Sequence, residues 1–296
     1  MDLLLQQLYN GVLVGSTYAL VALGFTLVLG TLDLLNFAHG ETIMFAAYAG
    51  LFALLAVGSN AGGSLPLAIA VAVATGALLG LVVYYGSFRF VDKKYWTAPA
   101  LSTVGIGLIL QTGATRFWGT EQRGVPDPLG DANLQLGPVT VGLSHLIILG
   151  VTVALMIGLH LLLKRTRLGR AMRAVAENHV TAALLGVPVE RTIAFTFLVS
   201  GVLAGAAGAL TSLVYHTITP FIGLNILLKG MTGMVIGGLG NVYGAMFGGV
   251  LVGILEVLAV GYLSSSYQDV LVFAALIAVL MFKPAGFFGI QVHERA

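Results

Sequence analysis

The chain has 296 residues, of which 58% are hydrophobic and 9% are charged, whereas about a quarter of the residues of a soluble domain are charged. This composition excludes a soluble globular protein and predicts an all-α, polytopic membrane protein with about eight or nine hydrophobic segments, some of them broken or re-entrant. The absence of cysteine excludes disulfides and thiol chemistry. The net charge of +2 gives no indication of nucleic-acid binding. One integral-membrane domain over residues 1–296 is the simplest organisation.

The first half of the chain begins with an uncharged run over residues 3–32, which exceeds the roughly 20 residues that a spanning helix needs. No basic region precedes this run, so we interpret it as a retained span and not as a signal peptide. Residues 42–88 are again uncharged and long enough for two spans. Arg89, Lys93 and Lys94 follow, and such a positive loop is retained in the cytoplasm.

The middle of the chain contains the longest polar interval, residues 164–192. A span over residues 95–115, a mixed-charge loop at 116–137 and a further span at 138–163 precede it. The interval begins with five cations: Lys164, Arg165, Arg167, Arg170 and Arg173. This second positive loop also belongs in the cytoplasm. The number of intervening spans then places residues 116–137 and the N-terminus outside.

A helical pattern starts within this polar interval. Apolar residues such as Met172 and Val175 share one face, and Arg173 and Glu177 stand four residues apart on the other. Gly186, followed by a proline, is a typical stop. We therefore predict one cytoplasmic amphipathic helix over residues 170–185. Its apolar stripe is mostly alanine, which favours docking to a soluble partner over adsorption to anionic lipid.

Ionisable residues lie between apolar neighbours at residues 31–42. Such groups at membrane depth are costly and usually line a cavity or pathway, and nearby glycines permit an interrupted helix. An interfacial loop that merely caps the next helix is an equal alternative. The candidate pathway or helix-break residues are Asp33, Asn36, His39, Gly40 and Glu41.

Glycine dominates the second half of the chain. Most glycines spaced by four residues are interpreted as helix-packing positions. A segment at 223–237 either crosses the membrane or re-enters, and consecutive glycines after it predict a helix break that must be buried or line water. The candidate residues of this break are Gly237, Gly238, Gly240 and Asn241. Glu256 and Asp269 are interpreted as boundary residues rather than ion-coupling groups.

The sequence contains no recognisable enzyme site. None of its lysines stands in a Walker A phosphate loop, and the zinc motif HExxH is absent. Ser200 or Ser87 could serve as a nucleophile only with a base, and the sequence pairs neither with one. We therefore expect a chain without catalytic activity.

Four stretches resemble the LivH-type permease subunit of branched-chain amino-acid ABC importers. ALGFTLVLGTLDLLNFAHGE at 22–41 looks like the signature of that family, and 170–210 is similar to its cytoplasmic loop and following span. GGLGNVYGAMFGGVLVGILE at 237–256 and KPAGFFG at 283–289 extend the resemblance along the chain.

The resemblance implies a permease subunit of the bacterial inner membrane that works with a LivM-like second permease, two cytoplasmic ATPases and a periplasmic binding protein. The chain itself would bind no cofactor and no metal, because the partner subunits use the ATP. A coupling loop at about 164–191 would dock on the ATPases. Arg170, Arg173, Ala174, Glu177 and Gly186 would belong to it, although Ala-Glu-Asn replaces the Glu-Ala-Ala of the family pattern.

Two alternatives remain open from the sequence. A permease of the same family could carry urea or short amides instead of amino acids. A stand-alone, ion-coupled secondary transporter would use membrane-embedded charges, for which Asp33 and Glu256 are the candidates.

Overall fold

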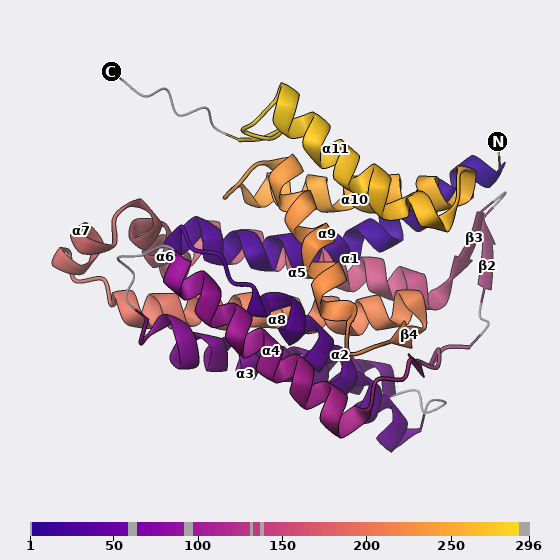
Figure 1. Ribbon diagram of the computed structural model, residues 1–296, viewed down its shortest axis with the longest axis horizontal. Coiled ribbons are helices and arrows are strands. Elements are labelled where there is room, and N and C mark those ends of the chain that lie inside the picture. Colours follow the sequence, from indigo (N-terminus) through magenta and orange to yellow (C-terminus); the bar gives the residue numbers. More distant parts are fainter. Residues whose placement is uncertain (1, 59–63, 92–96, 131–132, 137–138, 290–296) are drawn as a thin grey trace.

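The computed structural model describes residues 2–58, 64–91, 97–130, 133–136 and 139–289. Most of its helices run along the long axis of the molecule (Figure 1). Within these residues, seven helices are long and apolar enough to cross a membrane, the third with the π-helix Tyr84–Phe88 that extends it. They are α1 (Asp2–Leu32), α2 (Ala38–Val57), α3 (Ser64–Val83), α5 (Leu143–Arg165), α8 (Val189–Tyr215), α10 (Val242–Tyr262) and α11 (Gln268–Phe282), the last together with the 3₁₀ helix Ser265–Tyr267 that precedes it. The predicted all-α, polytopic membrane fold is confirmed.

Two further helices complete the bundle. Helix α4 (Thr97–Trp118) has 22 residues and occupies the span predicted at 95–115, but it is less apolar than the others. Helix α9 (Ile222–Gly237) has only 16 residues, and it runs steeply across the remaining helices (Figure 1). With these two, the bundle agrees with the predicted eight or nine segments.

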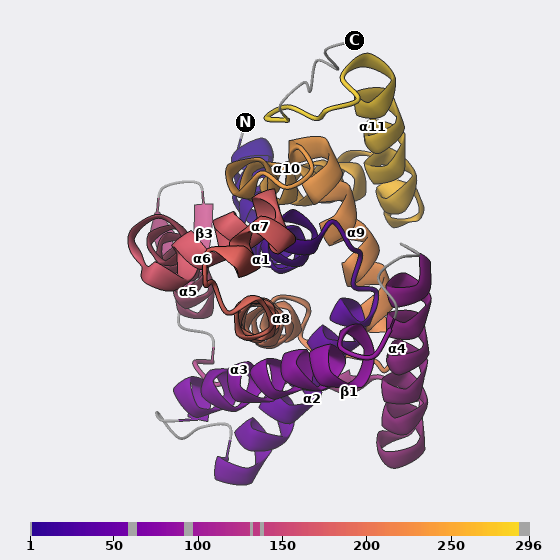
Figure 2. The ribbon, with the colours of Figure 1, turned by 90° about the vertical axis from the view of Figure 1, so that its left-hand side faces the viewer.

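Helix α1 forms the centre of the bundle. Its uncharged residues are hydrophobic on all sides, which is typical of a helix that is buried all round. In the end-on view of Figure 2, α1 is surrounded by α5, α6, α8, α9 and α10. Helices α5 and α11 expose most of their surface. They therefore form the outside of the bundle.

Glycines allow pairs of helices to approach with their backbones in contact. A Cβ atom on Gly253 of α10 would overlap the backbone of Gly15 in α1, and one on Gly76 of α3 would overlap the carbonyl oxygen of Gly201 in α8. Such close approach is possible only between small residues. The packing role predicted for these glycines is confirmed.

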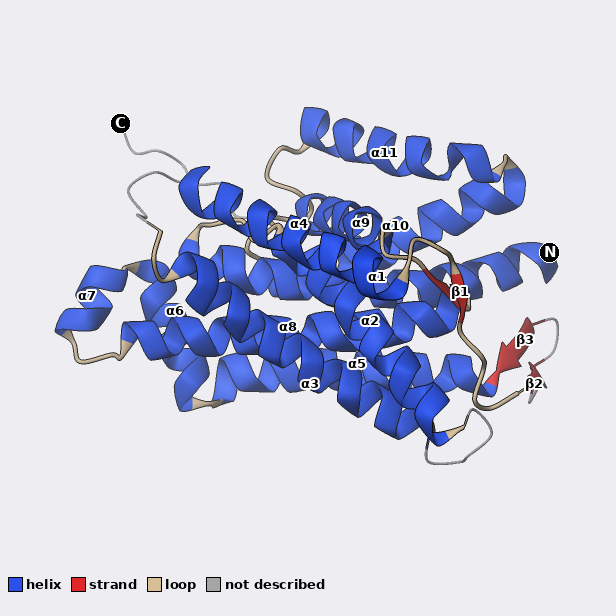
Figure 3. Cartoon of the chain, turned by 60° about the horizontal axis from the view of Figure 1, so that its bottom comes forward, coloured by secondary structure: helices blue, strands red, loops and turns tan. Residues whose placement is uncertain are grey.

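The two ends of the bundle differ in structure. One end carries short antiparallel strands, β1 (Arg123–Gly124) with β4 (Thr217–Ile218) and β2 (Asn133–Leu136) with β3 (Val139–Gly142) (Figure 3). The opposite end carries the short helices α6 (Arg167–Glu177) and α7 (His179–Leu184) (Figure 1).

The placement of the chain ends agrees with the predicted sidedness. At the strand end, the backbone N–H of Thr140 donates to Oε1 of Gln6 at 2.9 Å, which places the N-terminus beside the outer loop. Tyr84 donates to the carbonyl oxygen of Glu190 at 3.2 Å, so the π-helix that precedes the positive loop lies at the α6 end with the polar interval. Lys93 and Lys94 of that loop lie outside the described residues.

The segment that contains α9 crosses the bundle. The preceding helix α8 ends beside the strands, whereas the turn after α9 contacts the C-terminal segment. There, the N–H groups of Phe287 and Phe288 donate to the carbonyl oxygens of Ile236 and Gly237 at 2.9 and 2.8 Å. Residues 283–289 therefore lie at the same end as α6 and α7 (Figure 1).

Candidate functional site

The polar interval forms two helices and not the single helix predicted over 170–185. Helix α6 ends at Glu177, and the side chain of Asn178 accepts hydrogen bonds from the N–H groups of Val180 and Thr181 at 2.9 Å. Asparagine is a strong helix-capping residue. Asn178 therefore starts a new helix at a point where the amphipathic pattern predicted that one helix continues. Gly186 then ends α7 with a φ of 83°, as the predicted stop requires.

The predicted coupling residues lie on the open side of α6. Met172 and Val175 are buried against the bundle, whereas Arg170, Arg173 and Glu177 are exposed. Arg173 and Glu177 form no salt bridge in the described structure, and the guanidinium of Arg173 instead donates to the carbonyl oxygen of Leu163. This hydrogen bond ties α6 to the end of α5. Ala174 is half-buried and Gly186 is exposed.

Two clefts lie between α6 and the end of α1. One has a volume of about 510 Å³ and is lined by Asp33, Glu177 and His179. The other, of about 550 Å³, is lined by Asp33, Arg173 and Asn241, among others. The structure thus brings Asp33 together with the candidate coupling residues, and separates it from His39 and Glu41.

The segment between α1 and α2 enters the bundle as a helix break. Asp33 is exposed and has a φ of 54°, whereas Asn36 is buried and the N–H of Phe37 donates to Oγ1 of Thr103 on α4 at 3.1 Å. No side chain caps the start of α2. The buried part of this break fits the rule that non-helical backbone at membrane depth must be enclosed, whereas Asp33 is exposed at the end of the bundle and Glu41 lies in the first turn of α2.

His39 lies deep inside the bundle. A Cβ atom on Gly24 would collide with its ring, and Gly24 precedes the end of α1 by eight residues, or about 12 Å. The Oγ of Ser200 donates to the carbonyl oxygen of Gly24 at 2.8 Å and lies 3.4 Å from Nδ1 of His39. The structure therefore places a base beside Ser200, which the sequence did not reveal. The other ring nitrogen of His39 has no partner among the described residues.

The first turns of α2 and α9 meet in the interior. A Cβ atom on Gly40 would collide with the carbonyl oxygen of Gly223, so the two backbones touch. Glu41 follows directly and is only 8% exposed. Its Oε2 atom has no hydrogen-bond partner among the described residues. An unsatisfied buried acceptor costs about 1–3 kcal/mol, more than the roughly 0.3–1 kcal/mol that an acidic residue gains at a helix N-terminus.

We call Asn36, His39 and Glu41 the unpaired cluster. All three side chains are buried, and each has a polar atom without a hydrogen-bond partner in the described part of the chain: Oδ1 of Asn36, Nε2 of His39 and Oε2 of Glu41. Buried polar groups are satisfied in most protein interiors. Three unsatisfied groups within six residues therefore need a functional explanation.

A second cluster of buried charge was missed by the sequence analysis. Lys229 of α9 lies 2.7 Å from Oε1 of Glu256 in α10 and 3.3 Å from Asp269 in α11. The hydroxyl groups of Tyr18 and Tyr215 are 2.6 Å apart, and Tyr215 donates to Glu256 at 3.5 Å. We call these five residues the paired cluster. Glu256 is thus a buried ion-pair partner and not a boundary residue.

One signal in the sequence pointed to the paired cluster. Lys229 is a lone cation within a long apolar region, and an intramembrane cation requires an anionic partner. Glu256 and Asp269 are the first two acids that follow it in the chain. Both acids are distant from Lys229 in the sequence, so the contact was not predicted. It forms because α9 crosses beneath α10 (Figure 1).

The predicted glycine break forms the turn between α9 and α10. Helix α9 ends at Gly237, and Asn241 caps α10 by accepting from the N–H of Tyr243 at 3.0 Å. Gly238 and Gly240 have φ values of 119° and 75°, a backbone region in which glycine is favoured. Gly240 also lines the larger cleft at the α6 end.

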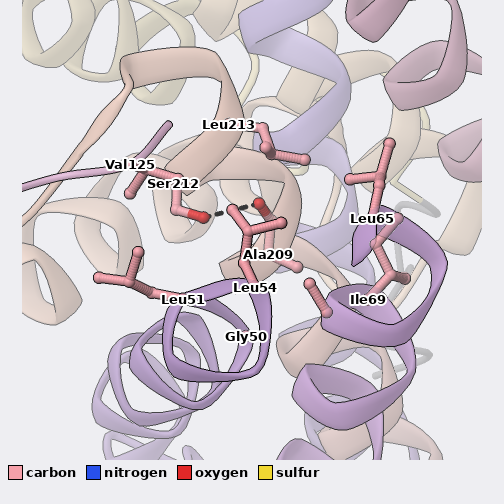
Figure 4. A pocket seen from close by; sticks show the side chains of 10 residues that line it. Gly50, Leu51, Leu54, Leu65, Ile69, Val125, Ala209, Ser212 and Leu213 are labelled. Atoms are coloured by element: carbon pink, nitrogen blue, oxygen red, sulfur yellow. Dashed lines mark hydrogen bonds between the residues drawn. The ribbon is translucent and has the colours of Figure 1, made fainter. Parts of the chain in front are cut away.

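A small cavity at the strand end is not a binding site. It is lined almost entirely by aliphatic side chains, including Leu51, Leu65 and Val125, and the hydroxyl of Ser212 donates to the carbonyl oxygen of Ala209 (Figure 4). Its volume is about 10 Å³, at the lower limit for a single water molecule. We interpret it as imperfect packing between α2, α3 and α8.

Comparison with known proteins identifies the family. Residues 7–280 match the family of the branched-chain amino acid transport system permease component. The chain is 36% identical to the permease protein LivH of the high-affinity branched-chain amino acid transport system of Escherichia coli (strain K12), and 35% identical to BraD of Pseudomonas aeruginosa. Each alignment covers 96% of this chain and 95% of the relative. A probable LivH of Methanocaldococcus jannaschii is 31% identical over 96% and 92% of the two chains.

The fold, with its central apolar helix, buried helix breaks and many apolar helices, is that of a multi-pass membrane protein. The chain belongs to the branched-chain amino acid transport permease family. The resemblance stated from its sequence motifs is confirmed.

Proposed function

We propose that this chain is one of two permease subunits of an ATP-driven importer of branched-chain amino acids in the bacterial inner membrane. A LivM-like permease would pair with it, two cytoplasmic ATPases would bind to it, and a periplasmic binding protein would deliver the substrate. The whole chain would act as one permease domain with its coupling loop at about 164–191. It would bind no cofactor itself and contact only protein partners and membrane lipid.

The observation that carries this proposal is the exposed tip formed by α7 at the α6 end. Leu184 and Leu185 are 83% and 79% exposed, and Val180 is 58% exposed. The tip projects beyond the ends of the spanning helices (Figure 1), so we expect a protein partner and not lipid tails to cover these side chains. A small apolar tip beside a basic helix is suited to a groove on a cytoplasmic partner.

A movement of this tip would reach the centre of the bundle. Helix α6 packs on the end of α1 and on the start of α8, and the clefts at Asp33 leave room for it to shift. ATP-driven closure of the ATPases would move the tip. The permease pair would then change the side on which its pathway is open, which is a shift between two populated states.

The pathway would lie along α9 and the start of α2. Helix α9 is short and crosses the bundle, yet it exposes Leu224 and Asn225, beside the exposed Phe221 that precedes it. A polar side chain and a broken helix at this depth need cover by protein or water. The second permease would supply that cover, and the substrate would pass between the two subunits.

The alternative of a stand-alone, ion-coupled transporter receives little support from the charges that it would need. Asp33 is exposed at the α6 end, and Glu256 is occupied by Lys229 at 2.7 Å. The alternative of urea or short amides as substrates would use the same architecture, so the uptake experiment below should include these solutes as competitors.

The test replaces the apolar tip by charge. The double variant Leu184→Glu/Leu185→Glu should lose the co-purified ATPases and should lower ATP-driven uptake of leucine by about tenfold or more, because charges in an apolar contact abolish docking. Subunits recovered in mild detergent are identified by mass spectrometry, and uptake is measured in proteoliposomes with the binding protein.

Leu263→Glu is the matched control. Leu263 is also exposed, at 63%, but follows α10 at the strand end of the bundle. It should retain both the ATPases and uptake. Normal ATPase binding and uptake in the double variant would reject the docking role, and a wild-type chain that transports leucine without any partner would reject the importer assignment as a whole.

A further inference from the structure

We propose that Glu41, together with the first turn of α9, binds the charged head group of an amino acid in transit. The carboxylate of Glu41 would accept the ammonium group, and the N-terminal turn of α9 would hold the carboxylate. This inference rests on the proposed transport of amino acids and names the residues that recognise their zwitterionic part.

The anion-binding half of the site comes from helix geometry. The first turns of α2 and α9 meet at Gly40 and Gly223, and neither helix has a side-chain cap. Free N–H groups and the positive end of the helix dipole make such a turn attractive to a carboxylate. Because Gly223 has no side chain, the backbone of Gly40 and the carboxylate of Glu41 lie directly against the first turn of α9.

The cation-binding half is a buried acid without a partner. Glu41 is 92% removed from solvent, since its exposure is 8%, and its Oε2 atom accepts no hydrogen bond within the described residues. This atom points to the start of α9, because a Cβ atom on Gly223 would lie 2.9 Å from it. The acceptor and the uncapped turn are therefore adjacent.

The protein offers Glu41 no cation of its own. Lys229 is the nearest cation along α9, but it lies six residues after Gly223 and already contacts Glu256 and Asp269. Within the described residues, these are the salt bridges of the chain. A buried acid of this kind is usually balanced by a charged partner, and the ammonium of the substrate has the required charge.

The surroundings of the site suit an aliphatic amino acid. Leu224 and Leu228 on α9 are 53% and 37% exposed, so an apolar surface adjoins the uncapped turn. Gly107 of α4 stands opposite Glu41, where a Cβ atom would lie 3.4 Å from its Cγ atom. A head group held by charge beside apolar walls is a common arrangement for selective binding of small ligands.

The experiment uses the complete importer in proteoliposomes, with the two permeases, the ATPases and the binding protein. Wild-type, ATP-driven uptake of radiolabelled leucine is measured first. Glu41→Gln should lower uptake at least about tenfold, because it removes one partner of a buried charge pair. ATPase activity stimulated by the liganded binding protein should stay within about twofold, since docking does not involve Glu41.

Two further variants separate binding from folding. Glu121→Gln changes an exposed acid of the outer loop and should leave uptake unchanged. Gly107→Ser keeps Glu41 but offers it a hydroxyl partner at a position with room for a side chain, and it should also lower uptake. Glu41→Asp should retain part of the activity of the wild type.

Binding of labelled leucine to the complex, without the binding protein, identifies the group that is recognised. Wild-type binding should resist competition by 4-methylpentanoate, which lacks the ammonium group. In the Glu41→Gln complex that preference should disappear, and leucine and 4-methylpentanoate should compete equally. A merely structural role of Glu41 would not change this preference.

The outcomes are distinct. Normal uptake in Glu41→Gln and Gly107→Ser, with an active wild type, overturns the head-group site but leaves the proposed function intact. Loss of subunits from both variants assigns Glu41 to packing and also overturns the site. If the wild-type complex shows no ATP-driven uptake of amino acids, the proposed function falls and the site falls with it.

Discussion

The paired and unpaired clusters both contain buried ionisable side chains, but only the paired cluster contains a salt bridge among the described residues. In the paired cluster, Lys229 contacts Glu256 at 2.7 Å and Asp269 at 3.3 Å. In the unpaired cluster, His39 and Glu41 each retain an atom without a partner and form no salt bridge in the described structure, whereas Glu256, whose Oε2 is also unpartnered, is paired with Lys229 through Oε1. Both clusters border α9, so this short helix contributes to a salt bridge at one point and lies beside polar atoms without partners at another.

This difference distinguishes buried polar residues that stabilise the fold from those that we assign to function. A buried ion pair across three helices fixes their register and is strongly destabilised when one partner is lost. An unsatisfied acceptor weakens the fold and is retained where a ligand supplies the partner. We therefore assign the paired cluster to positioning α9 and the unpaired cluster to the pathway that α9 borders.

The largest effect is expected from Lys229→Met. Removal of the cation leaves Glu256 buried without a partner, which should lower the free energy of unfolding by about 3–5 kcal/mol. Unfolding of the purified chain in a denaturing-detergent titration measures this loss. A change below about 1 kcal/mol would show that the pair contributes no more than an exposed salt bridge.

Lys229→Met/Glu256→Leu serves as the control for this change. The double variant removes both main charges, and apolar side chains of similar size often restore the stability of a broken buried pair. It should therefore be more stable than the single variant. If both variants are equally unstable, packing around Lys229 and not its charge would account for the loss.

Glu41→Met should affect leucine uptake strongly and the stability of the fold only slightly. Because it removes an unsatisfied acceptor, the free energy of unfolding should stay within about 1 kcal/mol of the wild type or rise, while leucine uptake is lost. Both quantities are measured on the same preparation. A destabilisation as large as that of Lys229→Met would show that Glu41 is a structural group, and the contrast between the clusters would disappear.

The sequence predicted the fold more completely than the clusters. Hydropathy, positive loops and glycine spacing depend on local composition, and they predicted the spans, which loops lie at the same end of the bundle, and a packing role for glycines such as Gly76 and Gly201, but not which glycines meet. The pairing of Lys229 with Glu256 depends on how α9 crosses the bundle, which local composition does not determine. The end of α6 before Asn178 was not predicted, because the amphipathic pattern continues past this residue. The side chain of Asn178 nevertheless caps a new helix there.

Local composition also did not determine that Glu41, and not Asp33, is buried. The motif at 31–42 marked Asp33, His39 and Glu41 as one group, since they are close in the sequence. The non-helical segment after α1 separates them in space, because it leaves Asp33 at the α6 end and carries His39 to the depth of Gly24. Only the packing of α2 against α9 shows which of the acids is buried.

The smallest effect should come from Asp269→Asn, the outermost position of the paired cluster. The side chain of Asp269 is 53% exposed and lies 3.3 Å from Lys229, so water screens the contact and its loss should cost about 0–1 kcal/mol. Lys229 keeps Glu256, and α11 keeps its apolar contacts through Val272. The same denaturing-detergent titration, carried out at low and high salt, measures the change. A loss comparable to that of Lys229→Met would mean that Asp269 anchors the otherwise exposed α11, and the paired cluster would then hold the periphery of the bundle as well as α9.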